Sequence, residues 1–104
     1  MCETEKTEKQ WNDLKSKLAI GTIVTGEIMA HWRFGAFVSM NRIDTPFVGL
    51  IEIIDFEDKL RPITPRDFPD IETTVRAVVL GFRDSNHQVA LSMKPSDLKK
   101  AEGK

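Results

Sequence analysis

Two phenylalanines, Phe34 and Phe37, stand three positions apart in the segment RFGAFV, with Gly35 and Ala36 between them. Aromatic rings exposed side by side stack on nucleobases, and this chemistry suits single-stranded RNA because every base offers a π-face. In a regular strand, however, neighbouring side chains point to opposite faces, so positions i and i+3 cannot share one. Either one ring belongs to the core, or the backbone departs from regularity between the two.

Further aromatic and basic residues flank the two rings. His31, Trp32 and Arg33 precede them, and Arg42 follows. The guanidinium of Arg33 can meet a phosphate or stack on a base. Trp32 is either a third stacking platform or a core tryptophan. These residue types are typical of a surface that binds single-stranded nucleic acid.

Signatures of catalysis and of metal binding are missing from the sequence. His31 and His87 are far apart, and neither has a Cys or His nearby at metal-ligand spacing. No nucleophile elbow, phosphate-binding glycine loop or zinc signature occurs. We therefore expect a non-catalytic protein that needs no cofactor and no metal.

Composition and charge limit the class of protein. The chain has 104 residues, 40% of them apolar and 30% charged, which predicts one soluble domain with a modest core. Its net charge of −1 counts against a strongly basic nucleic-acid binder, so any anion-binding face must be a local patch. The single cysteine, Cys2, cannot form an internal disulfide. With no signal peptide and no long apolar run, we expect a cytoplasmic protein without a membrane association.

An amphipathic helix is predicted near the start of the chain. Residues 1–7 form a flexible polar tail, and the helix runs from Glu8 to Leu18 within a segment assigned to 8–19. Trp11, Leu14 and Leu18 recur at i, i+3 and i+7, which places them on one helical face. We expect this face to pack on the core of the domain.

Five β-strands are predicted after Gly21, because β-branched residues and turn signals then dominate. Gly26 within the first strand suggests a bend or a bulge. A long connection with three prolines separates the third strand from the fourth, with a helical turn expected near Phe56 to Leu60. The strands are expected at residues 22–32, 34–40, 47–53, 73–82 and 88–93. This pattern predicts an all-β fold, a small closed or partly closed barrel over residues 20–95, followed by a charged tail at 96–104.

The segment from Ile20 to Lys94 resembles the S1 RNA-binding domain, a five-stranded member of the OB-fold group. The resemblance rests on Gly21 and Gly26 in the first strand, FGAFV in the second, VGLIEI in the third and the closing VALSMK. It implies a five-stranded OB-fold barrel with a short N-terminal helix, in a small stand-alone S1-domain protein. It also implies that Gly35 permits an irregular second strand, so that both phenylalanines reach the outer binding face.

The resemblance implies a set of RNA-binding residues and two departures from the family pattern. Glu52 stands where members typically have His, and Gln88 where they typically have a basic residue, whereas Asp84 matches an acidic position in the last turn. Alternation places Glu52 on the outer surface with Leu50, and a carboxylate there opposes an incoming phosphate. The RNA-binding residues expected are Phe34, Phe37, Arg33, Trp32, His31, Arg42, Glu52, Asp84 and Gln88.

Two functions follow from these residues. The first is a non-catalytic module that binds single-stranded RNA weakly and with low sequence specificity, in translation or RNA turnover. The second is an OB-type protein-interaction module that binds a ribosomal or RNA-processing protein. The aromatic rings and Arg33 favour the first function, and the acidic balance and Glu52 favour the second.

Overall fold

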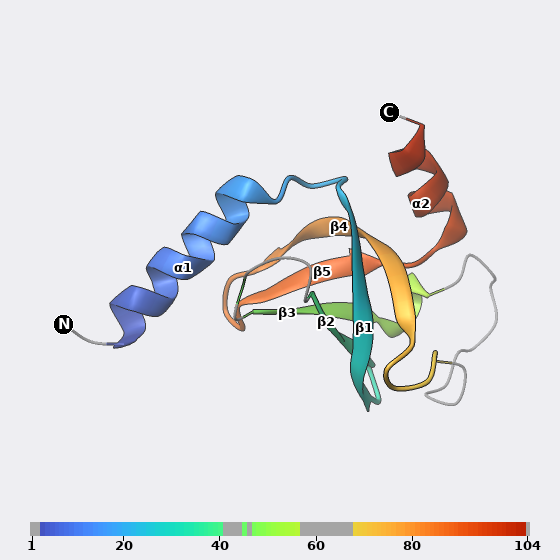
Figure 1. Ribbon diagram of the computed structural model, residues 1–104, viewed down its shortest axis with the longest axis horizontal. Coiled ribbons are helices and arrows are strands. Elements are labelled where there is room, and N and C mark those ends of the chain that lie inside the picture. The colour runs from blue at the N-terminus through green and yellow to red at the C-terminus, as the bar shows by residue number, and fades with distance from the viewer. Residues whose placement is uncertain (1–2, 41–44, 46, 57–67, 104) are drawn as a thin grey trace.

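The strands form a closed five-stranded barrel in the order β1-β2-β3-β5-β4 (Figure 1). The computed structural model describes residues 3–40, 45, 47–56 and 68–103 of the chain. All neighbouring strands pair antiparallel except β3 and β5, whose parallel pairing closes the barrel. The five strands are β1 (Ile23–Trp32), β2 (Gly35–Ser39), β3 (Val48–Glu52), β4 (Thr74–Arg83) and β5 (Gln88–Ser92). The predicted fold class is therefore confirmed.

Alternating side chains fill the inside of the barrel. Ala36 and Val38 of β2, Ile51 of β3, and Val89 and Leu91 of β5 are each at most 1% exposed. Their sequence neighbours point outward, since strand residues alternate between the two faces. The inward assignment of Ile51 is confirmed, and Ile53 packs against the same core while remaining partly exposed.

Two strands carry a register shift, and each shift exposes an apolar side chain. The shift in β1 falls between Ile28 and Ala30, and the shift in β4 falls between Val79 and Gly81. The extra residues, Met29 and Leu80, are 48% and 40% exposed. The bulge that was expected at Gly26 is thus found at Met29, three residues further along the chain. Gly26 serves a different purpose, because a Cβ there would overlap the backbone of the neighbouring strand β2.

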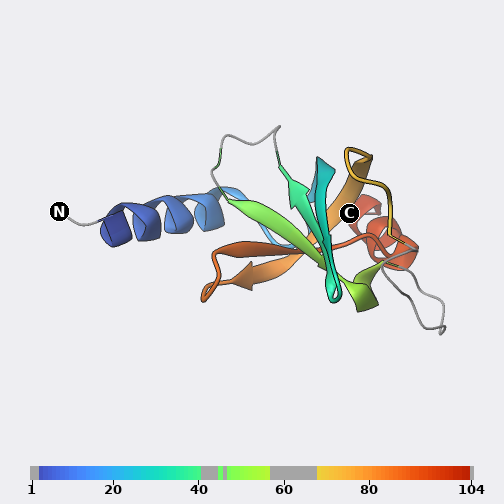
Figure 2. The ribbon, with the colours of Figure 1, turned by 90° about the horizontal axis from the view of Figure 1, so that it is seen from below.

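Helix α1 (Glu3–Lys17) packs on one end of the barrel (Figures 1 and 2). Trp11, Leu14 and Leu18 are buried, as their spacing predicts. The Trp11 ring meets those of Phe47 and Phe82 edge-on, with centroids 5.1 Å and 5.8 Å away. The helix begins at Glu3 rather than at Glu8, so the expected polar tail at 1–7 is helical from Glu3 onward.

Polar contacts fix this helix against the turn between β4 and β5. The indole Nε1–H of Trp11 donates to Asp84 Oδ1 at 2.7 Å, and the Lys15 ammonium lies 2.8 Å from the same oxygen. His87 Nε2 lies 2.8 Å from Glu8 Oε1. The hydrogen bonds from Lys15 and Trp11 hold the pKa of Asp84 below its ordinary value.

A second helix, α2 (Pro95–Glu102), lies at the opposite end of the barrel from α1 (Figures 1 and 2). The expected charged tail at 96–104 is thus helical over most of its length. Ser92 Oγ donates to Asp97 Oδ2 at 2.6 Å, and Arg76 of β4 pairs with Glu102 at 2.9 Å. Pro95 begins the helix, a position at which its missing N–H costs nothing.

The connection between β3 and β4 begins with a short 3-10 helix, η1 (Ile53–Asp55). Phe56 and Phe68, which border the part of the connection outside the described residues, are buried and stacked at 4.5 Å between centroids. The helical turn expected near Phe56 to Leu60 falls almost wholly outside the described residues. Neither α1 nor α2 is long and apolar enough to cross a membrane, and no other helix is described that could.

Replacement of Trp11 by Ala should destabilise the whole barrel. The indole is 1% exposed, and removal of a buried Trp side chain costs about 3–5 kcal/mol of unfolding free energy. Urea denaturation measures this loss. Asn12→Ala, at an exposed position on the same helix, is the matched control and should shift the midpoint little. An unchanged midpoint for Trp11→Ala would mean that α1 is an appendage that does not stabilise the barrel.

The contact between Asp84 and α1 should make stability depend on pH in the acid range. Because the folded-state pKa of Asp84 is depressed, its stabilising effect is present above the unfolded value of about 3.9 and disappears as pH falls through the folded value. Asp84→Asn should therefore be less stable than the wild type at neutral pH, and the difference should shrink in acid. Urea denaturation across this pH range tests the expectation. Asp13→Asn, which removes one negative charge at an exposed position of α1, is the matched control for the loss of charge.

Candidate nucleic-acid interface

An open depression lies on the outer face of the barrel where the β1–β2 turn approaches β3 and the β4–β5 turn. Its volume is about 490 Å³. One side is aromatic and comes from the β1–β2 hairpin, and the other is polar and comes from β3, β4, β5 and the turn between the last two. The lining residues are Trp32, Phe34, Phe37, Leu50, Glu52, Arg83, Asn86 and Gln88.

Both phenylalanines line this depression because Phe34 lies outside the regular strand. Trp32 pairs with Gly35, so Arg33 and Phe34 form the turn between β1 and β2. The strand pairings of β2 show no shift from Gly35 to Ser39, and the expected irregularity within β2 is therefore wrong. Phe37 points outward by strand alternation, and Phe34 joins it from the turn.

Gly35 holds the turn close to the end of β3. A Cβ at this position would overlap the carbonyl oxygen of Ile51, so only glycine permits the approach. The amide of Ile53 donates a hydrogen bond to the carbonyl oxygen of Phe34, which fixes the turn residue itself. The backbone therefore presents the Phe34 ring from a braced position.

The aromatic side of the depression offers rings of different exposure. Phe34 is 68% exposed and Trp32 is 55% exposed, whereas Phe37 is half-buried. The rings of Trp32 and Phe37 meet edge-on, with centroids 6.0 Å apart. Leu50, the direct partner of Phe37 on β3, is buried but lies outside the main core cluster. Trp32 is thus a surface residue and not a core tryptophan.

The polar side of the depression is organised by an ion pair. Arg83 Nη1 lies 2.6 Å from Glu52 Oε1, and both side chains are about two-fifths exposed. The positive charge of Arg83 offsets the carboxylate that was expected to repel phosphate. Asn86 comes from the β4–β5 turn, and Gln88 pairs with Arg83 at the start of β5. This side is therefore polar but close to neutral.

Asp55 and Lys94 form a second pair of charges near Glu52. Burial raises the pKa of Asp55, and the nearby carboxylates of Glu52 and Asp97 add to the rise. The ammonium of Lys94, 3.9 Å from Asp55 Oδ1, opposes it. Arg83 and Lys94 thus each offset one carboxylate of a segment that would otherwise be acidic.

Three of the predicted site residues do not line the depression, and a fourth falls outside the described residues. His31 Nε2–H donates to the Pro69 carbonyl oxygen at 2.7 Å, and its ring meets Phe68 edge-on. Asp84 is held by the side chains of α1. Arg33 is exposed in the turn and forms no ion pair with a described residue. Arg42 lies outside the described residues.

Three lining residues, Leu50, Arg83 and Asn86, are absent from the set of binding residues expected from the sequence. Arg83 immediately precedes Asp84, the residue that the family pattern suggests. The fourth strand was expected to end at Phe82, whereas it continues to Arg83. Phe82 packs against the core, so alternation alone could have placed Arg83 on the outer face.

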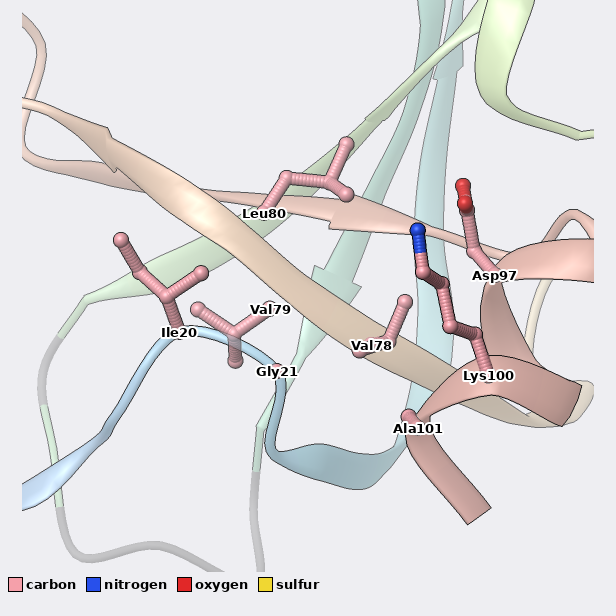
Figure 3. A pocket seen from close by; sticks show the side chains of 8 residues that line it. All are labelled: Ile20, Gly21, Val78, Val79, Leu80, Asp97, Lys100 and Ala101. Atoms are coloured by element: carbon pink, nitrogen blue, oxygen red, sulfur yellow. The ribbon is translucent and has the colours of Figure 1, made fainter. Parts of the chain in front are cut away.

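A second depression, of about 250 Å³, lies between β4, α2 and the segment before β1 (Figure 3). Val78 and Val79 of β4, together with Ile20 and Leu80, make it largely apolar, and Lys100 of α2 extends over it. It contains no aromatic side chain. This second depression therefore offers no ring on which a base could stack. The described part of the chain brings together no group of three side chains able to hold a metal ion.

Comparison with known sequences finds two similar proteins. No family model matches the chain. It is 27% identical over 88 residues to a 4-hydroxy-3-methylbut-2-enyl diphosphate reductase of Clostridium acetobutylicum, covering 85% of this chain and 13% of that protein. It is 27% identical over 78 residues to the small ribosomal subunit protein bS1 of Streptococcus pneumoniae, covering 75% and 18%. The chain thus spans less than one-fifth of the length of either relative.

Comparison with solved structures identifies the fold. A chain in the crystal structure of the a/eIF2alpha-aDim2p-rRNA complex from Pyrococcus horikoshii OT3 superimposes with a TM-score of 0.65 at 17% identity, covering 81% of this chain and 50% of that one. The closed barrel, its parallel β3–β5 pairing and the sequence similarity to ribosomal protein S1 agree with this likeness. The chain therefore has the S1-type OB fold.

Proposed function

We propose that this protein is a non-catalytic module that binds single-stranded RNA through the depression beside the β1–β2 turn. The observation that carries the proposal is that Trp32, Phe34 and Phe37 line one depression from a single hairpin. Unstacked bases can stack on such rings, whereas a duplex hides its base faces. The similarity to a ribosomal protein, and to a fold found in a complex with rRNA, supports RNA as the ligand.

The binding should be weak. Stacking contributes about 1–3 kcal/mol per base, so two stacked bases supply roughly 2–6 kcal/mol. A micromolar complex needs about 8.2 kcal/mol. Because Arg83 is paired with Glu52, the depression itself adds little net positive charge. Arg33, exposed in the turn beside Phe34, is a cation that can meet a phosphate next to the rings. We therefore expect micromolar or weaker affinity, with a cellular role in translation or RNA turnover in the cytoplasm.

A protein ligand on the same face is the second candidate function. The near-neutral polar side supports it, because a face built for the phosphate backbone alone would carry uncompensated cations. On this interpretation the exposed rings insert into a ribosomal or RNA-processing protein. The two candidates differ in their response to short oligonucleotides, which bind the face only in the first.

Truncation of either ring should weaken RNA binding while the barrel stays folded. Phe34→Ala and Phe37→Ala each remove a stacking surface, so the dissociation constant should rise at least about fivefold. NMR titration of labelled protein with a uridine pentamer measures the affinity and locates the binding face. Ile54→Ala, at a residue as exposed as Phe34 but outside the depression, is the matched control.

The same titration can contradict the proposal in two ways. Absence of any shift in the wild-type spectrum at millimolar oligonucleotide would exclude RNA binding at this face. Shifts that cluster around α2, away from Phe34 and Phe37, would place the binding site elsewhere. If Phe37→Ala unfolds, Phe34→Ala still tests the face, because its ring is largely exposed.

Removal of Arg83 should weaken RNA binding through charge. In Arg83→Gln the carboxylate of Glu52 is left unpaired on the face, and it repels a nearby phosphate by about 1 kcal/mol at 4 Å in water. The affinity for the uridine pentamer should therefore fall a few fold at about 20 mM salt, and the loss should vanish near 1 M, where the Debye length is about 3 Å. Arg76→Gln, which breaks the pair with Glu102, is the control. A loss that persists unchanged at high salt would show that charge is not the cause.

A further inference from the structure

The polar groups of the depression come from the strands that follow the aromatic hairpin in the barrel order. The rings come from the β1–β2 hairpin, whereas Glu52, Arg83, Asn86 and Gln88 come from the other strands and the β4–β5 turn. A base that stacks on one of these rings would therefore have these polar groups within the same depression. Base edges, and not base faces, carry sequence information.

The Glu52–Arg83 pair presents an acceptor directly beside a donor. A carboxylate only accepts hydrogen bonds and a guanidinium only donates them. The two groups are joined through Nη1 and Oε1 at 2.6 Å, and each side chain remains about two-fifths exposed. Among the described residues no other hydrogen bond of either side chain is found, so Oε2 of Glu52 and further N–H groups of Arg83 remain available. A complementary base must therefore offer donors beside an acceptor.

We propose that this ion pair reads the identity of one stacked base and prefers guanine, an inference that rests on the proposed RNA-binding function. The N1–H and N2–H groups of guanine form two parallel donors for the carboxylate of Glu52. Its O6 atom, which lies next to N1, accepts from the guanidinium of Arg83. One planar edge of guanine then supplies hydrogen-bond partners to both Glu52 and Arg83.

The other bases match the pair less well. Adenine and cytosine each offer one exocyclic amino donor beside a ring acceptor, so one carboxylate oxygen gains no partner from the base. Uracil offers one donor flanked by two carbonyl oxygens, and one of these carbonyls would face the carboxylate. Inosine is guanosine without the N2 amino group. The difference in affinity between guanosine and inosine therefore measures the contribution of the N2–H donor. Stacking alone distinguishes these bases little, because each has a π-face.

The test compares pentamers of the form UUXUU, in which X is guanosine, inosine, adenosine, cytidine or uridine. NMR titration or fluorescence anisotropy at about 50 mM salt gives each dissociation constant for the wild-type protein. We expect the guanosine pentamer to bind about tenfold more tightly than the uridine pentamer, and the inosine pentamer to fall between them. This comparison needs no variant, so the result does not depend on how a substitution folds.

Two variants assign the preference to the ion pair. Glu52→Gln keeps the shape of the side chain but removes the second acceptor, so guanosine and inosine pentamers should bind equally. Glu102→Gln, which removes a carboxylate from an Arg–Glu pair at α2, should leave the preference unchanged. A guanosine preference that persists in Glu52→Gln would overturn the assignment to this residue.

The outcomes separate the base preference from the RNA-binding function. Equal affinity of the wild type for all five pentamers would overturn the base preference and leave RNA binding intact. Failure to bind any pentamer would overturn the proposed function and the base preference with it. Tighter binding of the uridine pentamer than of the guanosine pentamer would also overturn the preference for guanine.

Discussion

Closure of the barrel through the parallel pairing of β3 with β5 is the constraint on which the rest of the structure depends. It brings Glu52 and Arg83, 31 positions apart in the chain, to within 2.6 Å of each other. The antiparallel pairing of β2 with β3 in turn sets the end of β3 against the β1–β2 turn, where Gly35 permits the contact with Ile51. Without closure, the aromatic hairpin would have no polar wall opposite it, and the depression would not exist.

The rings and the polar groups of the candidate interface come from different elements of the barrel. The rings come from one short hairpin, whose turn is braced by the hydrogen bond between Ile53 and Phe34. The polar groups come from strand ends and the β4–β5 turn. Most of the lining residues, including two of the three rings, stand on strands, and only Phe34 and Asn86 come from turns, so strand pairing positions most of the interface.

The two helices occupy opposite ends of the barrel (Figure 2), and neither contributes a residue to the lining of the depression. Helix α1 contacts the β4–β5 turn through Trp11 and Lys15, which both bond to Asp84. The β4–β5 turn thus connects α1 to the depression. Asp84 bonds to α1, whereas Asn86 and the preceding strand residue Arg83 line the depression. Asp84, the acidic residue that the family pattern offers as a binding residue, is part of the contact that holds α1.

The sequence by itself determined the barrel, its five strands and the buried face of α1, because periodicity and turn residues act locally. Side-chain alternation within the third strand likewise sufficed to place Ile51 inside and Glu52 outside. The early start of α1 and the helix at 95–102 did not follow from the sequence, since polar, charged segments show little apolar periodicity.

Only the tertiary structure decided which polar groups meet across the depression. Three contacts join residues that are distant in the sequence. They are the Glu52–Arg83 ion pair, the hydrogen bond from Trp11 to Asp84 and the hydrogen bond from His31 to Pro69. Such contacts are set by strand order and register, which no local pattern of residues encodes.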